Sequence, residues 1–256
     1  MCRVDPLIEL SYEQLSKAKR IILIGGGKGG VGKSVISAGI AFSLSKNYKV
    51  GVLDLDLQGP AIPVLFTHKL KERLRGDKEG LKPIILGNLS VMSLGFIVEE
   101  RPLPLSGRDR ADAVLEFLAH IHWNPLDYLI VDLPPGMGDE VLVPLRIIKK
   151  LKHGFIVVTR SSRLALPVTK RFIEFLRKEQ VKILGVIENM YEPYLASKYE
   201  ERVRELLNRY EVELLGKVPY DPYLESLLLN ERNILESEKL ARAFREISPK
   251  VVKLLN

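Results

Sequence analysis

The chain has 256 residues, of which 46% are hydrophobic and 28% are charged, and this composition excludes a disordered or fibrous protein in favour of a globular one. The 39 Lys and Arg are scattered among 32 Asp and Glu, so the net charge of +7 permits an anionic partner without requiring one. The single cysteine, Cys2, excludes an internal disulfide framework, and no apolar run is long enough for a signal peptide or a membrane span, so we expect a cytoplasmic protein.

Strand and helix patterns alternate along the chain. Residues 1–19 read as an N-terminal extension with a short helix, and residues 236–256 as a closing C-terminal helix. The alternation predicts an α/β fold, a mostly parallel sheet with helices on both faces, in a single domain spanning residues 1–256. Between the two ends we expect strands at 20–24, 49–54, 83–86, 89–94, 129–132, 154–159, 183–188 and 214–218, helices at 33–46 and 110–122, and a turn at Gly87-Asn88 that joins two of the strands.

The segment Gly25–Ser34 lies between the first strand and the first long helix and satisfies the spacing G-x-x-x-x-G-K-[ST]. This pattern predicts a phosphate-binding loop, because glycines let successive backbone N–H groups point at phosphate oxygens. Lys33 is expected on the β- and γ-phosphates, and the Ser34 hydroxyl on Mg²⁺. The predicted nucleotide-binding residues of the loop are Gly27, Lys28, Gly29, Gly30, Val31, Gly32, Lys33, Ser34 and Val35.

Carboxylates stand at the ends of two predicted strands, where open α/β sheets bind their ligands. Asp132 ends an apolar run and precedes Pro-Pro-Gly, which is the placement of a Walker-B acid that holds Mg²⁺. Asp54 and Asp56 lie on the same side of an extended chain, since strand side chains repeat every two residues. We expect Asp56 to orient the attacking water and Asp54 to support the metal shell, so that Ser34, Asp54, Asp56 and Asp132 form the magnesium site, partly through water.

The motifs resemble those of a known class of ATPases. Lys28–Ser34 is similar to the deviant Walker A of the MinD/ParA class of P-loop ATPases (SIMIBI/MinD-like). Within that class, segments 54–63 and 132–140 are similar to the Mrp-type ATPases, the iron–sulfur cluster carrier family, and Ile187–Met190 and Val218–Asp221 match later landmarks in the right order. The resemblance covers about residues 20–225.

The resemblance implies ATP and ADP as ligands, Mg²⁺ as cofactor, and hydrolysis of ATP. Lys28 would reach across an ATP-bound homodimer to the partner's nucleotide. With Lys33 on the phosphates and Asp56 at the attacking water, it completes the expected set of catalytic residues. Asn189, with Pro219, Tyr220 and Asp221, would line the adenine.

Three features depart from the family pattern, and the first concerns the binding of an iron–sulfur cluster. Cluster-carrying relatives have a Cys-x-x-Cys pair shortly after the Glu-Asn-Met landmark, and here residues 191–199 contain no cysteine. We therefore expect no iron–sulfur cluster of the family type. Met137, where a threonine is usual, and the segment Ser106–Arg110 also depart from the pattern.

Two other functions remain open from the sequence. A positioning ATPase acting on membrane or DNA could use the C-terminal stretch, where Leu240, Phe244 and Ile247 share one face, although Ser248-Pro249 is expected to interrupt that helix. A non-catalytic adaptor could present the aromatic segment Tyr191–Tyr199 to a protein. The sequence gives no strong indication of nucleic acid or membrane, and a protein client stays unidentified.

Overall fold

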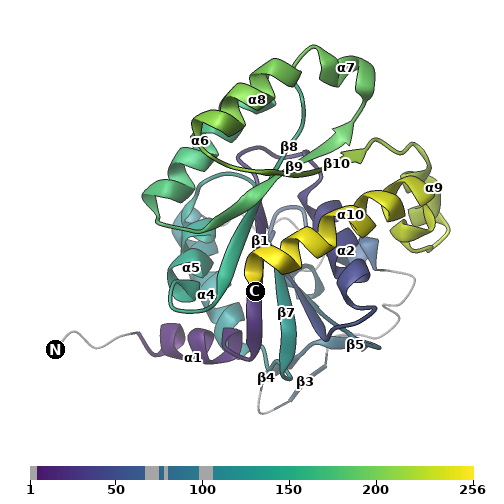
Figure 1. Ribbon diagram of the computed structural model, residues 1–256. Coiled ribbons are helices and arrows are strands. Elements are labelled where there is room, and N and C mark those ends of the chain that lie inside the picture. The colour runs from purple at the N-terminus through teal and green to yellow at the C-terminus, as the bar shows by residue number, and fades with distance from the viewer. Residues whose placement is uncertain (1–4, 67–74, 78–79, 98–105) are drawn as a thin grey trace.

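Eight strands form one sheet in the computed structural model, which describes residues 5–66, 75–77, 80–97 and 106–256 (Figure 1). All neighbouring strands run parallel except the edge strand β5, which pairs antiparallel with β6 through the predicted turn at Gly87-Asn88. The predicted α/β class with a mostly parallel sheet is confirmed. The order across the sheet is β10 (Leu214–Pro219), β9 (Ile183–Tyr191), β8 (His153–Thr159), β1 (Ala18–Gly25), β7 (Leu126–Asp132), β2 (Val50–Asp54), β6 (Leu89–Ser93) and β5 (Ile84–Leu86).

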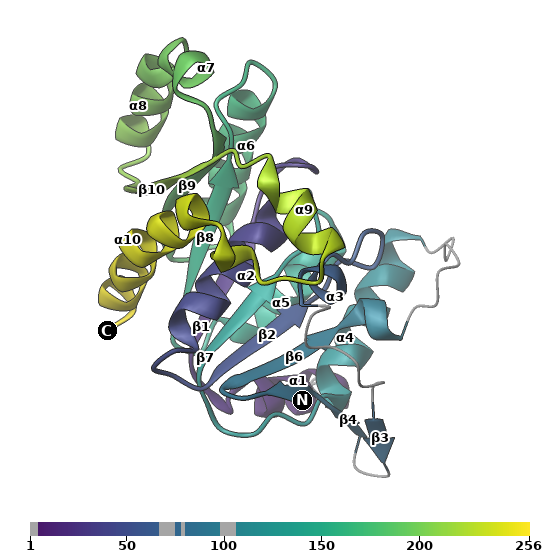
Figure 2. The same ribbon diagram turned by 90° about the vertical axis from the view of Figure 1, so that its right-hand side faces the viewer.

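Helices cover both faces of this sheet (Figure 2). One hydrophobic core joins it to α1 (Pro6–Leu15), α4 (Gly107–His120), α5 (Asp139–Ile148), α6 (Ala165–Lys178) and α8 (Glu200–Arg209). The other core joins it to α2 (Lys33–Leu44), α3 (Ile62–Leu65), α9 (Tyr223–Leu229), α10 (Glu238–Leu255) and the 3-10 turn η2 (Ile234–Glu236). The remaining elements are α7 (Pro193–Ser197), the 3-10 turn η1 (Leu94–Phe96), and the two-stranded pair β3 (Arg75–Asp77) and β4 (Gly80–Lys82), which the sequence did not predict.

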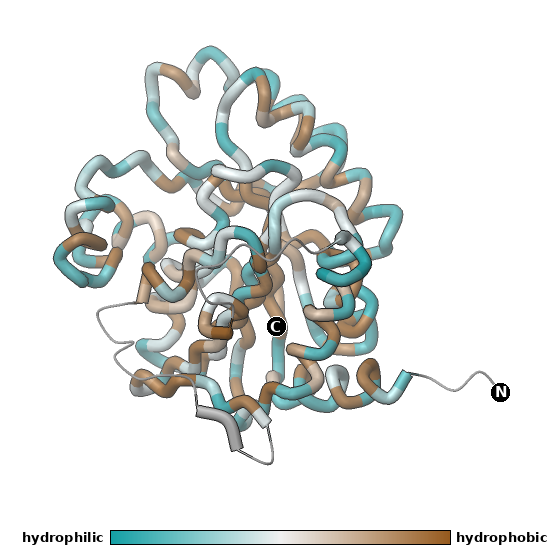
Figure 3. Tube along the Cα trace, turned by 180° about the vertical axis from the view of Figure 1, so that it is seen from behind, coloured by the Kyte–Doolittle hydropathy of each residue, from teal (hydrophilic) through white to brown (hydrophobic). Residues whose placement is uncertain are grey.

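The central strands are apolar on both faces because both faces are covered. Residues 21–24 of β1 are completely buried, as parallel strands between two helical layers require. Figure 3 shows the same arrangement as hydrophobic segments in the middle of the molecule. β1 lies between β8 and β7, and β7 lies between β1 and β2, so the ends of β1, β7 and β2 lie next to one another.

The start of α4 is fixed by a capping box. Ser106 Oγ accepts a hydrogen bond from the Asp109 backbone N–H, and the Asp109 carboxylate accepts one from the Ser106 backbone N–H. The helix therefore begins at Gly107 rather than at Arg110, where we had predicted its start. The segment Ser106–Arg110, noted as a departure from the family pattern, is this helix start.

α10 runs without interruption through Pro249, so the predicted break at Ser248-Pro249 is wrong. Ile247 and Val251, on either side of the proline, are buried against the sheet and α2, and this packing offsets the backbone hydrogen bond that proline cannot make. Leu240 and Phe244 are buried in the same core, so the apolar face considered for membrane contact is already occupied. Within the part of the chain that the structure describes, no helix is long and apolar enough to cross a membrane.

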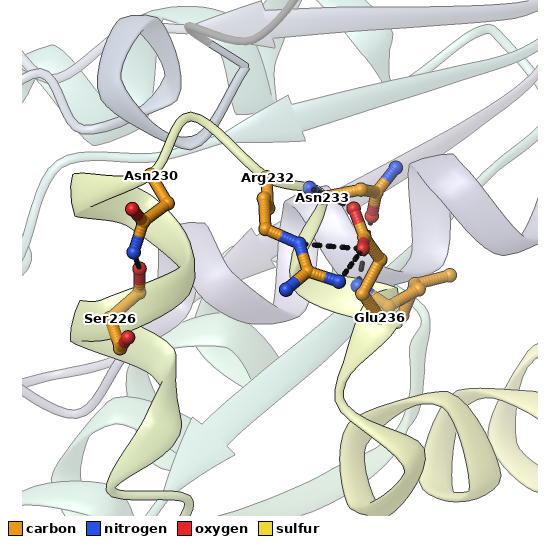
Figure 4. A network of polar contacts seen from close by, with 6 residues as sticks. Ser226, Asn230, Arg232, Asn233 and Glu236 are labelled. Atoms are coloured by element: carbon orange, nitrogen blue, oxygen red, sulfur yellow. Dashed lines mark hydrogen bonds and ion pairs between the residues drawn. The ribbon is translucent and has the colours of Figure 1, made fainter.

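The connection from α9 to α10 is held by short-range polar contacts (Figure 4). The Asn230 side-chain amide donates to the Ser226 carbonyl at 2.7 Å. Arg232 Nε donates to the Glu236 carboxylate at 2.8 Å, and the Asn233 backbone N–H donates to the same carboxylate at 3.1 Å. These contacts fix the path of the chain from the end of α9 to the start of α10.

Candidate functional site

The loop Gly25–Gly32 joins β1 to α2 at the carboxyl edge of the sheet. Gly32 has φ +80°, in the left-handed region that favours glycine, and a Cβ there would lie 2.1 Å from Asn189 Nδ2. A Cβ at Gly27 would lie 2.8 Å from Val168 Cγ1 on α6. Glycine is therefore needed for both the conformation and the close packing of this loop, and its path brings the chain to the N-terminus of α2, where backbone N–H groups favour anions.

The two lysines of the loop lie in different environments. Lys33, the first residue of α2, is only 7% exposed, and its charge partly offsets the rise that burial causes in the pKa of Asp132. Lys28 is exposed to solvent. Among the other predicted loop residues, Gly29 and Gly30 are exposed, Gly27, Gly32, Ser34 and Val35 are half-buried, and Val31 is buried.

Asp132, the last residue of β7, is buried and only half satisfied by the protein. Its Oδ1 accepts a hydrogen bond from Ser37 Oγ at 2.9 Å, whereas Oδ2 is buried with no hydrogen-bond partner among the described residues. Burial raises the pKa of Asp132 to about 6, against the lowering effects of Ser34, Lys33 and Ser37. An unpaired buried carboxylate oxygen is costly, which points to a ligand that completes it.

Asp54, the last residue of β2, is completely buried, and both of its oxygens are used by the protein. Oδ1 accepts a hydrogen bond from the Asp56 N–H at 3.0 Å, and Oδ2 accepts hydrogen bonds from Ser93 Oγ at 2.9 Å and the Ile62 N–H at 3.3 Å. Burial, and then the charge of Asp132, raise the pKa of Asp54 to about 8. The open oxygen of the site therefore belongs to Asp132, and Asp54 holds the chain that leads to Asp56.

Asp56 lies in the turn after β2 and is half-buried. Its Oδ1 accepts hydrogen bonds from the backbone N–H groups of Gln58 and Gly59, both at 3.0 Å. Because Asp54 and Asp56 are joined through the Asp56 N–H, the first carboxylate fixes the position of the second. Among the described residues, Asp56 Oδ2 has no hydrogen-bond partner, so it can contact a ligand or a water.

Asn189, in β9, lies against the loop from the other side. Its Nδ2 donates to the Val31 carbonyl at 2.8 Å, with the Gly32 carbonyl at 3.4 Å, and the residue is 3% exposed. The amide nitrogen thus holds the phosphate-binding loop, and any contact to a base would come from the amide oxygen.

The segment Pro219–Asp221 begins at the last residue of β10 and lies beside β9, since Pro219 is in register with Tyr191. Tyr220 is 58% exposed. Asp221 is buried, and its carboxylate accepts hydrogen bonds from the Tyr223 N–H at 3.0 Å and from the Ser237 hydroxyl. Of this predicted adenine-lining set, Asp221 is therefore engaged in fixing the start of α9 and α10.

The predicted aromatic segment Tyr191–Tyr199 does not form one patch. Tyr194 and Leu195, in α7, are 70% and 43% exposed. Tyr199 packs against the hydrophobic core, and Tyr191 is half-buried with Lys217 Nζ 4.5 Å from its ring centre. Only α7 offers aromatic surface here.

The donors present suit a small hard cation. Ser34 and Asp132 supply a hydroxyl and a buried carboxylate oxygen, and Mg²⁺ prefers oxygen ligands together with substrate phosphates over a cage of protein groups. In keeping with this, the described residues hold no group of three or more His, Cys, Asp or Glu arranged for a metal. Met137, another departure from the family pattern, is 39% exposed just beyond Asp132.

Sequence reasoning missed two serines that shape this site. Ser37 donates to Asp132, and Ser93 donates to Asp54. Ser37 follows Lys33 by four residues on the same helix face, a spacing that could have identified it. Ser93 lies 39 residues from Asp54, and no local pattern connects the two.

A family model described as NUBPL iron-transfer P-loop NTPase matches residues 17–252. The cytosolic Fe-S cluster assembly factor Nubp2 homolog 2 of Drosophila yakuba is 36% identical over 236 residues, which cover 87% of this chain and 90% of that protein. The iron-sulfur cluster carrier protein of Aquifex aeolicus is 38% identical over 215 residues, covering 80% of this chain and 58% of that protein.

Two solved structures are similar in fold. The nucleotide-binding protein of Archaeoglobus fulgidus in complex with ADP is 32% identical, with a TM-score of 0.72 and coverage of 94% of this chain and 98% of that one. The cell division ATPase MinD of Pyrococcus furiosus has a TM-score of 0.63, covering 92% of this chain and 99% of that one. At 20% identity the latter shows a shared fold alone.

Proposed function

The chain belongs to the family of NUBPL-type iron-transfer P-loop NTPases, and from this premise we propose that it binds Mg-ATP, hydrolyses it to ADP and phosphate, and acts as an ATP-dependent homodimer switch built on one domain. The observation that carries the proposal is the buried Asp132 Oδ2, which has no partner among the described residues, next to Lys33 and Ser34. The ADP complex of the Archaeoglobus fulgidus relative supports a nucleotide as the ligand.

The residues of the loop divide the work of phosphate binding. The backbone N–H groups at the start of α2 bind phosphate oxygens, and the nearly buried Lys33 places its charge on the β- and γ-phosphates. Ser34 and Asp132 hold Mg²⁺, which when bound neutralises charge that develops on the transferred phosphoryl group. Val31 and Val35 flank the phosphates.

Asp56 orients the attacking water through the oxygen that its own turn does not use. Asp54 positions Asp56 through the hydrogen bond to the Asp56 N–H, and this refines the metal-shell role first expected of it. Gly59-Pro60 follows directly, so a change in the contact between Asp56 and its ligand is passed to this turn.

Lys28 acts on the second nucleotide of the dimer. It is exposed in a loop whose other lysine is buried, so its ammonium is free to reach another molecule. Two subunits would then bind face to face around ATP and separate after hydrolysis. Adenine would lie against Pro219 and Tyr220, with the Asn189 amide oxygen on its edge.

The switch would not move a cluster held in the family manner. A cluster shared by two subunits requires four thiolates, and two copies of this chain have two, from Cys2, which lies outside the described residues. We propose that the client of this switch is a protein and not an iron–sulfur cluster, since residues 190–199 contain no cysteine. Iron and sulfide analysis after anaerobic reconstitution tests this, because a bound cluster at one per dimer would contradict it.

The switch is tested by measuring ATP turnover and molar mass in solution on the same samples. We expect Lys28→Ala and Asp56→Ala to bind Mg-ATP with little change in affinity and to hydrolyse it at least about tenfold more slowly. Asp56→Ala should accumulate as an ATP-bound dimer, whereas Lys28→Ala should not. Lys46→Ala, which removes an exposed lysine just beyond the far end of α2, is the matched control and should behave as wild type.

Each part of the proposal has its own contrary outcome. Wild-type turnover in Lys28→Ala would show that this lysine has no role across a dimer. Intact Mg-ATP binding without turnover in the wild-type protein at any temperature would favour a nucleotide-stabilised adaptor instead. A monomer under all conditions would rule out the dimer switch while leaving hydrolysis in place.

A further inference from the structure

A groove with a volume of about 310 Å³ lies between α6 and α8, which are neighbours in Figure 1. Its α6 wall is made by Arg163, Leu166, Pro167 and Lys170. These positions are spaced by three, four and seven residues, so they share one side of the helix and the turn before it. The wall is basic at both ends and apolar between them.

The α8 wall repeats this spacing with Arg202, Glu205, Leu206 and Arg209. Arg202 and Arg209 are exposed, and Leu206 is half-buried against the core. The two walls together present four basic side chains and one carboxylate. This group of basic residues cannot be recognised in the sequence, because residues 171–201 separate its two halves. The halves meet only when α6 packs beside α8.

Most of this positive charge has no ion-pair partner among the residues that the structure describes. Among the described residues, no carboxylate lies within ion-pair distance of Arg163, Arg202 or Arg209. Lys170 alone has a partner, Glu174, at 3.9 Å. The guanidinium groups of Arg163 and Arg202 are therefore available to an anionic ligand, and that of Arg209, 5.7 Å from the centre of the Tyr210 ring, has no carboxylate to neutralise its charge.

The floor of the groove is apolar. It is formed by Leu166, which is 8% exposed, with Leu206 and the ring of Pro167. Arg163, Arg202 and Arg209 are exposed, so the same groove offers basic groups to solvent beside this apolar surface. A ligand that fits both features carries apolar side chains along one side and carboxylates along its flanks, as an amphipathic acidic helix does.

We propose that the groove between α6 and α8 is a docking site for an acidic amphipathic helix of a protein partner. Single-stranded nucleic acid fits poorly because the described lining residues include no aromatic side chain for base stacking, and a duplex presents phosphates but no apolar side chains for the floor. A membrane surface would meet the exposed arginines with its headgroups but would supply no apolar side chain for the floor between them.

The groove lies one helix away from the phosphate-binding loop. Val168, on the neighbouring side of α6, packs against Gly27, and Thr169 of the same helix shares a hydrogen bond with Thr159 at the end of β8. A helix bound in the groove would thus contact an element that also contacts the loop. The docking proposal itself does not depend on nucleotide binding or hydrolysis.

The test uses fluorescence anisotropy of a fluorescein-labelled peptide of about fourteen residues built from Glu-Leu-Leu-Glu repeats, with a Lys-for-Glu peptide as the negative probe. We expect saturable binding of the acidic peptide that weakens as salt is added. The double change Arg202→Glu and Arg209→Glu should weaken binding at least about tenfold. The double change Arg242→Glu and Arg245→Glu on α10 alters the net charge equally and should leave binding within about twofold of wild type.

Equal weakening by the two double variants would show attraction to net charge rather than docking in the groove, and would overturn the proposal. The proposal would also be overturned if the acidic peptide did not bind while duplex DNA or phosphatidylglycerol vesicles bound in a way that depends on Arg202 and Arg209. Thermal unfolding of each variant verifies the fold. If charge reversal lowers the midpoint, the Arg202→Gln and Arg209→Gln pair takes its place, with the same expected direction.

Discussion

Asp54 and Asp132 are paired in register across the neighbouring strands β2 and β7, and both carboxylates are buried. Two buried acids side by side cannot both ionise cheaply, because each charge raises the cost of the other. Burial is the main cause of the raised pKa of each group, about 8 for Asp54 and about 6 for Asp132, and the charge of Asp132 adds to the rise at Asp54. Without metal, the folded protein holds protons here that the unfolded chain releases.

The first prediction is that the metal-free protein becomes less stable as pH rises from about 4 to about 8. Because the pKa of Asp54 is higher in the folded than in the unfolded state, unfolding releases a proton in this window, and the stabilisation present at low pH is lost. Asp54→Asn should be less stable at every pH, since one oxygen acceptor is replaced by a donor. The pH-dependent part that Asp54 contributes, about 3–4 kcal/mol between pH 5 and pH 8, should disappear, and the smaller part that Asp132 contributes should remain. Urea unfolding at both pH values measures it.

Asp127 provides a control of opposite sign. Hydrogen bonds from the Lys19 ammonium at 2.8 Å and the Lys49 backbone N–H at 2.9 Å lower the pKa of Asp127. Its stabilisation is therefore present above about pH 4 and lost as pH falls further. Asp127→Asn should weaken the protein at neutral pH and leave the pH 5 to pH 8 slope as in wild type. An Asp54→Asn slope equal to that of Asp127→Asn would contradict the first prediction.

The second prediction concerns the contact between α2 and α10. A Cβ at Gly39 would lie 2.1 Å from the ring of Phe244, which is completely buried. Gly39→Ala should therefore lower the free energy of unfolding by about 1–3 kcal/mol, because the ring has no room to move. Gly107→Ala is the matched control: it is also helical, its nearest neighbour is an Arg110 nitrogen at 4.0 Å, and it should be neutral or slightly stabilising. Thermal denaturation of the two variants distinguishes them, and equal midpoints would refute the packing argument.

The third prediction assigns Asn189 to the phosphate-binding loop. Asn189→Ala removes the hydrogen bond from Nδ2 to the buried Val31 carbonyl, so the free energy of unfolding should fall by about 1–2 kcal/mol. Nucleotide affinity should fall with it, since the loop loses its support. Asn88→Ala removes a similar bond, to the Ser45 carbonyl at 3.0 Å, on the surface and should leave nucleotide affinity unchanged. Calorimetric titration with ADP compares the two variants; an unchanged affinity in Asn189→Ala would remove this role.

Local patterns predicted the parts of the site that depend on local sequence. The loop Gly25–Ser34 and Asp132 each follow an apolar run, and an apolar run followed by a polar residue marks the edge of a sheet whatever the rest of the chain does. Non-local contacts were not predictable in this way. Ser93 satisfies Asp54 from 39 residues away, and Ser237 occupies the carboxylate of Asp221, which sequence reasoning had placed at the adenine.

The same distinction explains the basic groove and the closing helix. Arg163 and Arg202 look like scattered surface charges in the sequence, because only the packing of α6 beside α8 brings them together. Pro249 predicts a helix end from its own backbone chemistry, and the burial of its neighbours outweighs that local preference. Sequence patterns therefore predicted the order of elements better than the partners of individual side chains.

The fourth prediction follows from this competition in α10. Pro249 lies inside the helix on its exposed side, where it has no N–H to donate to the Arg245 carbonyl. Pro249→Ala restores that donor without disturbing the buried neighbours Ile247 and Val251, so the free energy of unfolding should rise by about 1–3 kcal/mol. Lys253→Ala, a change to alanine later in the same helix, should alter it by less than about 0.5 kcal/mol. Urea unfolding and hydrogen exchange of α10 amides measure the effect. A loss of stability in Pro249→Ala would mean that α10 depends on the bend that proline imposes.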